Sequence, residues 1–129
     1  MSGRFLLDSN IVIAFFADEK VVVERVEALP QVFVPVIVVG ELLYGAAKSA
    51  RSLENERRVL DFSQSVSLLD VSRSTAQAYA SIKNNLRTKG HPIPENDIWI
   101  AAIAKEHGLT VVTRDPHFAA VDGLTVETW

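Results

Sequence analysis

The sequence contains no cysteine, which excludes disulfide bonds and any site built on a thiolate. It also lacks the glycine patterns of common phosphate-binding loops, since neither GxGxxG nor a Walker pattern occurs. No internal repeat, low-complexity stretch or linker divides the chain. Its 129 residues suit one domain spanning residues 1–129 and are enough for a substantial core.

An excess of positive charge is missing too. The sequence has 13 Lys and Arg residues and 16 Asp and Glu residues, which gives a net charge of −3. This excludes binding to nucleic acid by bulk positive charge alone, but leaves open an acidic site that works through metal ions. The apolar run near the N-terminus, broken by Asp8, is too short to span a bilayer and carries no signal-peptide cleavage pattern. We therefore expect a cytoplasmic protein with no membrane contact.

Apolar segments of strand and helix type alternate along the chain. We expect strands over residues 5–7, 32–34, 66–71, 109–113 and 124–127. We expect helices over 11–16, 21–29, 36–50, 53–63 and 98–107, and one more between a cap at Ser72 or Ser74 and a stop at Gly90. The helix over 98–107 is apolar all round, so it should be deeply buried. This alternation predicts an α/β fold with a parallel sheet covered on both faces.

Four acidic residues fall at corresponding ends of these elements. Asp8 and Asp115 follow the first and fourth expected strands, at the edge of a parallel sheet where ligands bind. Glu41 lies early in the helix after the second strand, and Asp97 opens the buried helix, so both helix starts face the same edge. Each acid alone is also explained as a helix cap, a first-turn residue or a turn residue. Their common placement favours one shared cleft.

Carboxylates at such close range repel, so the cluster requires shared protons or bound cations. Oxygen ligands without cysteine favour a hard ion, Mg²⁺ or Mn²⁺. The histidines, His91, His107 and His117, are too scattered along the chain to suggest a metal set of their own.

Four segments that carry these acids resemble the motifs of PIN-domain ribonucleases, in the order that family shows them. They are LLDSNIVI, GELLYGA, IPENDIWIAA and VVTRDPHF. The resemblance is closest to the VapC-type toxins of type II toxin–antitoxin pairs, and it extends over the whole chain to the GLTVETW ending. It implies a three-layer α/β/α sandwich with a central, mostly parallel sheet.

The resemblance also implies a function and a site. The family consists of metal-dependent ribonucleases that hydrolyse phosphodiester bonds in RNA, typically as homodimers silenced by a cognate antitoxin. Its four acids, which are both catalytic and metal-binding, fall on Asp8, Glu41, Asp97 and Asp115. Asp8 and Asp97 would hold Mg²⁺ (or Mn²⁺), with Glu41 and Asp115 completing its surroundings. Two supporting polar positions, which would hydrogen-bond the acids or a bound water, fall on Asn10 and Thr113.

Substrate contact needs positive charge near the acids, because phosphates dominate affinity for nucleic acid. Arg114, next to Asp115, is the first candidate. Weaker candidates, equally explained as solvated surface charges, are Lys48, Arg51, Lys83, Arg87, Lys89 and His91. Three aromatic residues on or near the first helices suit core packing: Phe15, Phe16 and Tyr44. If they are exposed, the resemblance implies that they line a groove for an apolar antitoxin segment.

Three alternatives remain open at this point. A phosphatase could use Asp8 as its nucleophile, although Asn10 stands where such enzymes carry a second acid. A PIN-like protein could bind RNA or a partner without cleaving, although all four acids are present. A housekeeping RNA-processing nuclease would carry the same residues as a toxin.

Overall fold

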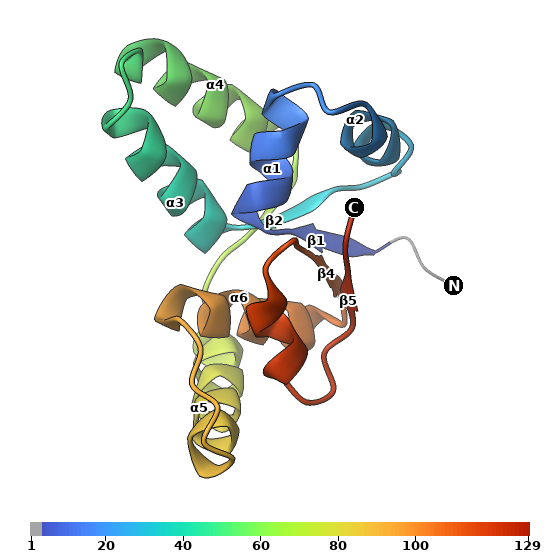
Figure 1. Ribbon diagram of the computed structural model, residues 1–129, viewed down its shortest axis with the longest axis vertical. Coiled ribbons are helices and arrows are strands. Elements are labelled where there is room, and N and C mark those ends of the chain that lie inside the picture. Colours follow the sequence, from blue (N-terminus) through green and yellow to red (C-terminus); the bar gives the residue numbers. More distant parts are fainter. Residues whose placement is uncertain (1–3) are drawn as a thin grey trace.

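The computed structural model describes residues 4–129, in which strands and helices alternate (Figure 1). The strands are β1 (Phe5–Leu7), β2 (Phe33–Pro35), β3 (Ser67–Leu69), β4 (Thr110–Val112) and β5 (Val126–Glu127). The helices are α1 (Ser9–Phe16), α2 (Lys20–Glu27), α3 (Val36–Ala47), α4 (Ser52–Gln64), α5 (Arg73–Thr88) and α6 (Glu95–His107), with a short 3₁₀ helix, η1 (Pro116–Ala120). Every expected strand and helix is present.

The five strands form one parallel sheet in the order β3-β2-β1-β4-β5. From β1 in the middle, the chain runs outward through β2 and β3, then returns to β4 and β5 on the other side. Between β1 and β4 the direction of winding reverses, and open α/β sheets bind ligands at such a point. Because Leu7 pairs with Val112, the next residues of the two strands, Asp8 and Thr113, lie side by side at this position.

Helices cover both faces of the sheet. In Figure 1, α1 to α4 lie above the strands and α5, α6 and η1 below them. The expected three-layer α/β/α arrangement with a parallel sheet is confirmed. None of the helices within residues 4–129 is both long and apolar enough to cross a membrane.

Helix α6 forms the centre of the lower layer, as its apolar sequence predicts. Ile98 and residues 100–104 are all buried, and Gly108 ends the helix in the left-handed conformation at φ 65°. The helix begins at Glu95, three residues before the expected start, because the Pro94 carbonyl already accepts hydrogen bonds from the N–H groups of Asp97 and Ile98. Asp97 therefore lies within the first helical turn.

Other boundaries differ from the expectation for local reasons. Helix α1 starts at Ser9 because Asp8 caps it, and α3 ends at Ala47, where the Ser49 hydroxyl donates to the Ala46 carbonyl (2.7 Å). The edge strands β3 and β5 are shorter than expected, since each pairs with only one neighbour. Strand β2 spans Phe33–Pro35, one residue later in the chain than the expected 32–34.

A polar contact joins the start of α5 to α6. Ser72 caps α5 and forms a reciprocal capping box with Thr75, whose hydroxyl accepts from the Ser72 N–H (2.9 Å). The same buried hydroxyl donates to Glu106 of α6, which also accepts a hydrogen bond from the Ser72 hydroxyl (2.8 Å). This contact links the N-terminal end of α5 to the C-terminal end of α6.

Replacing Thr75 by Val should therefore destabilise the fold by about 1–2 kcal/mol, because it removes the Thr75 half of the capping box and leaves Glu106 short of a donor. Urea unfolding would measure the change. Thr88→Val, at the exposed end of the same helix, is the matched control and should cost less than about 0.5 kcal/mol. Equal losses for the two variants would contradict the role of Thr75.

Candidate active site

Asp8 lies where β1 turns into α1, and it performs two tasks. Its main-chain carbonyl begins the helix by accepting from Ile11 and Val12, and its Oδ1 caps the helix by accepting from the Ser9 N–H (2.8 Å). The side chain is only 4% exposed. The capping explanation for this aspartate is therefore correct, but the cap uses one carboxylate oxygen and holds the other toward β4.

That second oxygen, Oδ2, is bound by Thr113 and Asn10. The Thr113 hydroxyl donates to it at 2.7 Å, and the Asn10 side-chain amide lies 3.3 Å away. Thr113 in turn accepts from the N–H of Asp115 (3.0 Å), and the Asn10 side-chain carbonyl accepts from the N–H of Arg114 (3.0 Å). These bonds connect the ends of β1 and β4 and fix the direction of the Asp8 carboxylate.

Asp97 and Asp115 meet on His117. Asp97, buried in the first turn of α6, places its Oδ2 2.9 Å from His117 Nδ1. Asp115 caps η1 by accepting from the His117 N–H (3.0 Å), and the same oxygen, Oδ1, lies 2.8 Å from His117 Nδ1. One imidazole nitrogen thus contacts two carboxylates that come from different elements.

Glu41, on α3, faces the same crevice. Its Oε2 accepts from the side-chain amide of Asn96 (3.2 Å). Its Oε1 is buried and has no hydrogen-bond partner among the described residues. An unpartnered buried carboxylate oxygen is costly, so this atom needs a proton or a cation.

The four acids influence one another electrostatically. Burial raises the pKa of Asp8, Glu41 and Asp97, and neighbouring carboxylates raise each of them further. The charge of Asp115 acts on Asp8 and Asp97, and the charges of Asp8 and Asp97 act on Glu41. The hydrogen bond to Asp97 raises the pKa of His117. The crevice therefore concentrates negative charge, as the sequence led us to expect.

Two neighbours of the acids, His117 and Asn96, escaped the sequence analysis. The histidines were weighed only against one another, whereas His117 alone joins the acids. The signal was local: an Asp-Pro-His turn whose Asp caps the next residues brings the histidine back over its own carboxylate. For Asn96, no pattern in the sequence indicates a bond to a residue as distant as Glu41.

Arg114 has other partners in this structure. Its guanidinium binds both carboxylate oxygens of Glu19 (2.7 and 3.2 Å) and donates to the main-chain carbonyl of Trp129 (3.0 Å). This two-point hydrogen-bonded ion pair lowers the pKa of Glu19 and raises the pKa of Arg114. Arg114 thus connects the turn after β4 to the C-terminal residue, and its contact with RNA stays a prediction.

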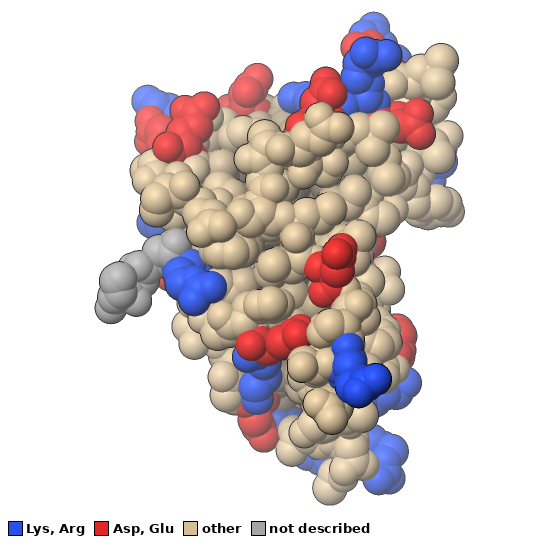
Figure 2. All heavy atoms as spheres, turned by 180° about the vertical axis from the view of Figure 1, so that it is seen from behind, with Lys and Arg blue, Asp and Glu red and all other residues tan. Residues whose placement is uncertain are grey.

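The weaker basic candidates lie on exposed surfaces. Three contact acidic side chains: Lys83 with Glu95 (3.0 Å), Lys89 with Asp122 (2.8 Å) and Arg51 with Glu54 (3.4 Å). On the face shown in Figure 2, basic and acidic side chains are interspersed rather than gathered by sign. No basic patch on that face compensates for the acidic crevice.

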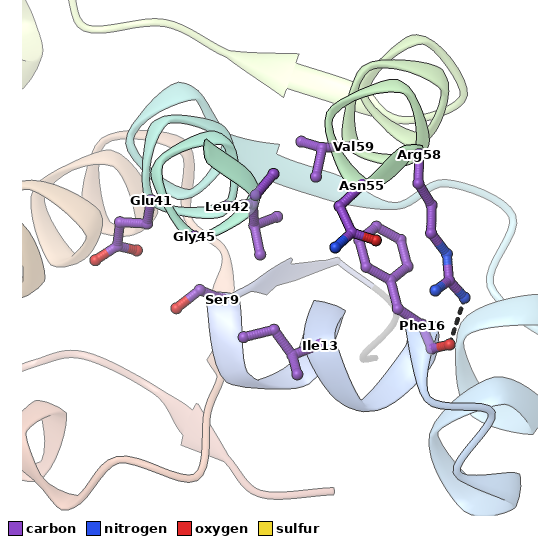
Figure 3. A pocket seen from close by; sticks show the side chains of 10 residues that line it. Ser9, Ile13, Phe16, Glu41, Leu42, Gly45, Asn55, Arg58 and Val59 are labelled. Atoms are coloured by element: carbon purple, nitrogen blue, oxygen red, sulfur yellow. Dashed lines mark hydrogen bonds between the residues drawn. The ribbon is translucent and has the colours of Figure 1, made fainter. Parts of the chain in front are cut away.

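A groove of about 340 Å³ runs from Glu41 between α1, α3 and α4. Glu41 and Ser9 lie at one end and Asn55 and Arg58 at the other, with apolar side chains between them (Figure 3). These apolar side chains are Ile13, Phe16, Leu42 and Val59. Of the aromatic residues expected to line a groove, only Phe16 does so here, whereas Phe15 packs on Phe62 and Tyr44 is exposed on α3.

Comparison with known proteins agrees with the four motifs. A family model described as PIN domain matches residues 5–124. Ribonuclease VapC2 of Haemophilus influenzae is 34% identical over 131 residues, covering 98% of each chain. The tRNA(fMet)-specific endonuclease VapC of Shigella flexneri is 30% identical over 129 residues, with the same coverage.

The solved structures show the same relationship in three dimensions. A chain of the DNA-bound VapBC structure from Salmonella typhimurium superposes with a TM-score of 0.91 and 30% identity, over 100% of this chain and 99% of that one. The residues that the family model matches include all four acidic segments. This chain therefore belongs to the PIN-domain family, and within it to the VapC type.

Proposed function

We propose that this protein is a metal-dependent ribonuclease that cuts RNA internally, and that it is the toxin of a toxin–antitoxin pair. The observation that carries the proposal is the convergence of four carboxylates from separate segments, one of them with an unpartnered buried oxygen. Two relatives bear the names of ribonucleases, which supports RNA as the substrate. The proposed place of action is the cytoplasm, where RNA targets are found.

The residues fit a divalent cation. Asp8, Glu41, Asp97 and Asp115 offer oxygen atoms, the ligands preferred by Mg²⁺ and Mn²⁺. The buried Oε1 of Glu41 is the atom that most needs a positive partner. When bound, such an ion would lower the pKa of water and neutralise negative charge on the scissile phosphate.

The protein's own groups prepare the reaction. The hydrogen bonds from Ser9, Thr113 and Asn10 hold the Asp8 carboxylate in one orientation, so no reorganisation is needed when substrate arrives. Glu41 carries a raised pKa and a free oxygen, which suits it to take the proton of the attacking water. Asp115, at the rim of the crevice, is the alternative proton acceptor.

Asp8→Asn should reduce the rate of RNA cleavage in Mg²⁺ by about 100-fold or more, because an amide binds a divalent ion poorly. Asparagine still caps a helix well, so circular dichroism should show a folded variant. Asp61→Asn, an exposed acid on α4, is the matched control and should cut at the wild-type rate. Undiminished cleavage by Asp8→Asn would overturn the proposal.

Glu41→Gln should raise the melting temperature in EDTA by a few degrees, since about 1 kcal/mol shifts it by roughly 2–8 °C at this size. A carboxyl whose folded pKa is raised contributes its full stability below its unfolded pKa, and this contribution is lost as pH rises through the folded pKa. At neutral pH the ionised Glu41 therefore costs stability that glutamine does not. Calorimetry would test this, with exposed Glu56→Gln expected to change nothing. A lower melting temperature for Glu41→Gln would contradict the assignment.

The groove beside Glu41 is the proposed seat of the antitoxin. The solved chain to which this chain is similar belongs to a structure named VapBC, and this similarity supports a protein partner. The groove's apolar floor suits an apolar segment, and its end at Glu41 lets that segment cover the acids. Homodimer formation is proposed on the family resemblance, and exposed Tyr44 on α3 is available to an interface.

Ile13→Asp should weaken binding of the antitoxin at least about tenfold, because it places a charge on the apolar floor. Ile13 is 56% exposed in the free protein, so the substitution should fold. Calorimetric titration with the product of the neighbouring reading frame would measure the affinity. Leu53→Asp, at an 81% exposed position that does not line the groove, is the control. Equal affinities for both variants would place the antitoxin elsewhere.

A further inference from the structure

We propose that His117 is a ligand of the metal ion, together with Asp97 and Asp115, and that its imidazole makes the site favour Mn²⁺ over Mg²⁺. The inference rests on the proposed function, since it concerns the same cation. It adds a nitrogen ligand to the set of four acids.

The spacing of three atoms supports this assignment. His117 Nδ1 lies 2.9 Å from Asp97 Oδ2 and 2.8 Å from Asp115 Oδ1, and all three candidate ligand atoms lie within 4.8 Å of one another. With metal–ligand bonds of about 2.1 Å, neighbouring ligands of an octahedral ion are about 3 Å apart. The two observed separations match neighbouring positions around one ion.

The hydrogen-bond chemistry points the same way. A neutral imidazole has a single N–H, and Nδ1 faces two carboxylate oxygens at nearly equal distance. One proton cannot lie along both directions, so neither contact is an ideal hydrogen bond. A cation among the three atoms satisfies all of them at once, with Nδ1 as a deprotonated ligand.

The chain holds this imidazole in place. Asp115 accepts from the main-chain N–H of His117 (3.0 Å), and Pro116 restricts the backbone between them. The next residue, Phe118, is completely buried and anchors the turn in the core. The His117 side chain is still 44% exposed, so an ion can reach it from solvent.

The ligand types decide the preference among ions. Mg²⁺ binds oxygen ligands almost exclusively, whereas imidazole nitrogen suits first-row transition metals. Mn²⁺ accepts both carboxylate and imidazole ligands, so a site with two aspartates and one histidine should distinguish the two ions. Removing the imidazole should then affect Mn²⁺ much more than Mg²⁺.

The experiment measures metal binding rather than catalysis. Titration of the metal-free protein followed by electron paramagnetic resonance gives the affinity for Mn²⁺, and competition gives that for Mg²⁺. His117→Ala should weaken Mn²⁺ binding about tenfold or more and Mg²⁺ binding less than about threefold. His91→Ala, which removes an exposed histidine elsewhere, is the matched control and should change neither affinity.

A second readout needs no variant. The electron spin-echo modulation of Mn²⁺ bound to the wild-type protein should contain the signal of a directly bound nitrogen. The frequencies of this signal should shift when histidine is labelled with ¹⁵N. The shift should disappear in labelled His117→Ala. Absence of a bound nitrogen in the wild type, or equal losses for the two ions, would overturn the role of His117.

Failure of this inference is distinguishable from failure of the proposed function. If the wild-type protein binds Mn²⁺ and cuts RNA, but shows no bound nitrogen, only the role of His117 is wrong. If the wild-type protein binds neither ion and leaves RNA intact, the proposed function falls, and the inference falls with it.

Discussion

The repulsion between four neighbouring carboxylates, two of them buried, is the constraint on which the rest of this structure depends. Such a cluster would spread apart on a flexible scaffold. Here Asp8 and Asp115 follow adjacent strands of the sheet, and Asp97 begins a helix that is buried on all sides. The rigid apolar elements therefore hold the acids together despite their repulsion, at a cost to the stability of the fold.

The same side chains cap helices and supply carboxylates to the acidic crevice. Asp8 caps α1 and Asp115 caps η1, and in each case the cap orients the carboxylate. Thr113 joins the two by donating to Asp8 and accepting from the N–H of Asp115. A capping role therefore does not exclude a role in the proposed site. In both cases the main-chain N–H that the cap binds fixes the direction of the carboxylate at the end of a strand.

Much of the fold followed from local patterns. The apolar segments predicted all five strands and six helices, and the all-round apolar character of residues 98–107 predicted the burial of α6. The boundaries were less accurate where a cap or a hydrogen bond to a neighbouring residue decides them. The early start of α6 at Glu95 depends on hydrogen bonds to the Pro94 carbonyl, which a periodic sequence pattern does not predict. Edge strands were overestimated because pairing with a single neighbour limits their length.

The sequence by itself determined the alternation of strands and helices, the four acids at their ends and the family they mark. These features are local, since each depends on periodicity, caps and residue types within a short segment. Only the tertiary structure decided that His117 contacts Asp97 and Asp115, that Asn96 binds Glu41 and that Arg114 is engaged by Glu19. These contacts join residues from different elements, and their distances depend on how the helices pack against the sheet, which local patterns do not specify.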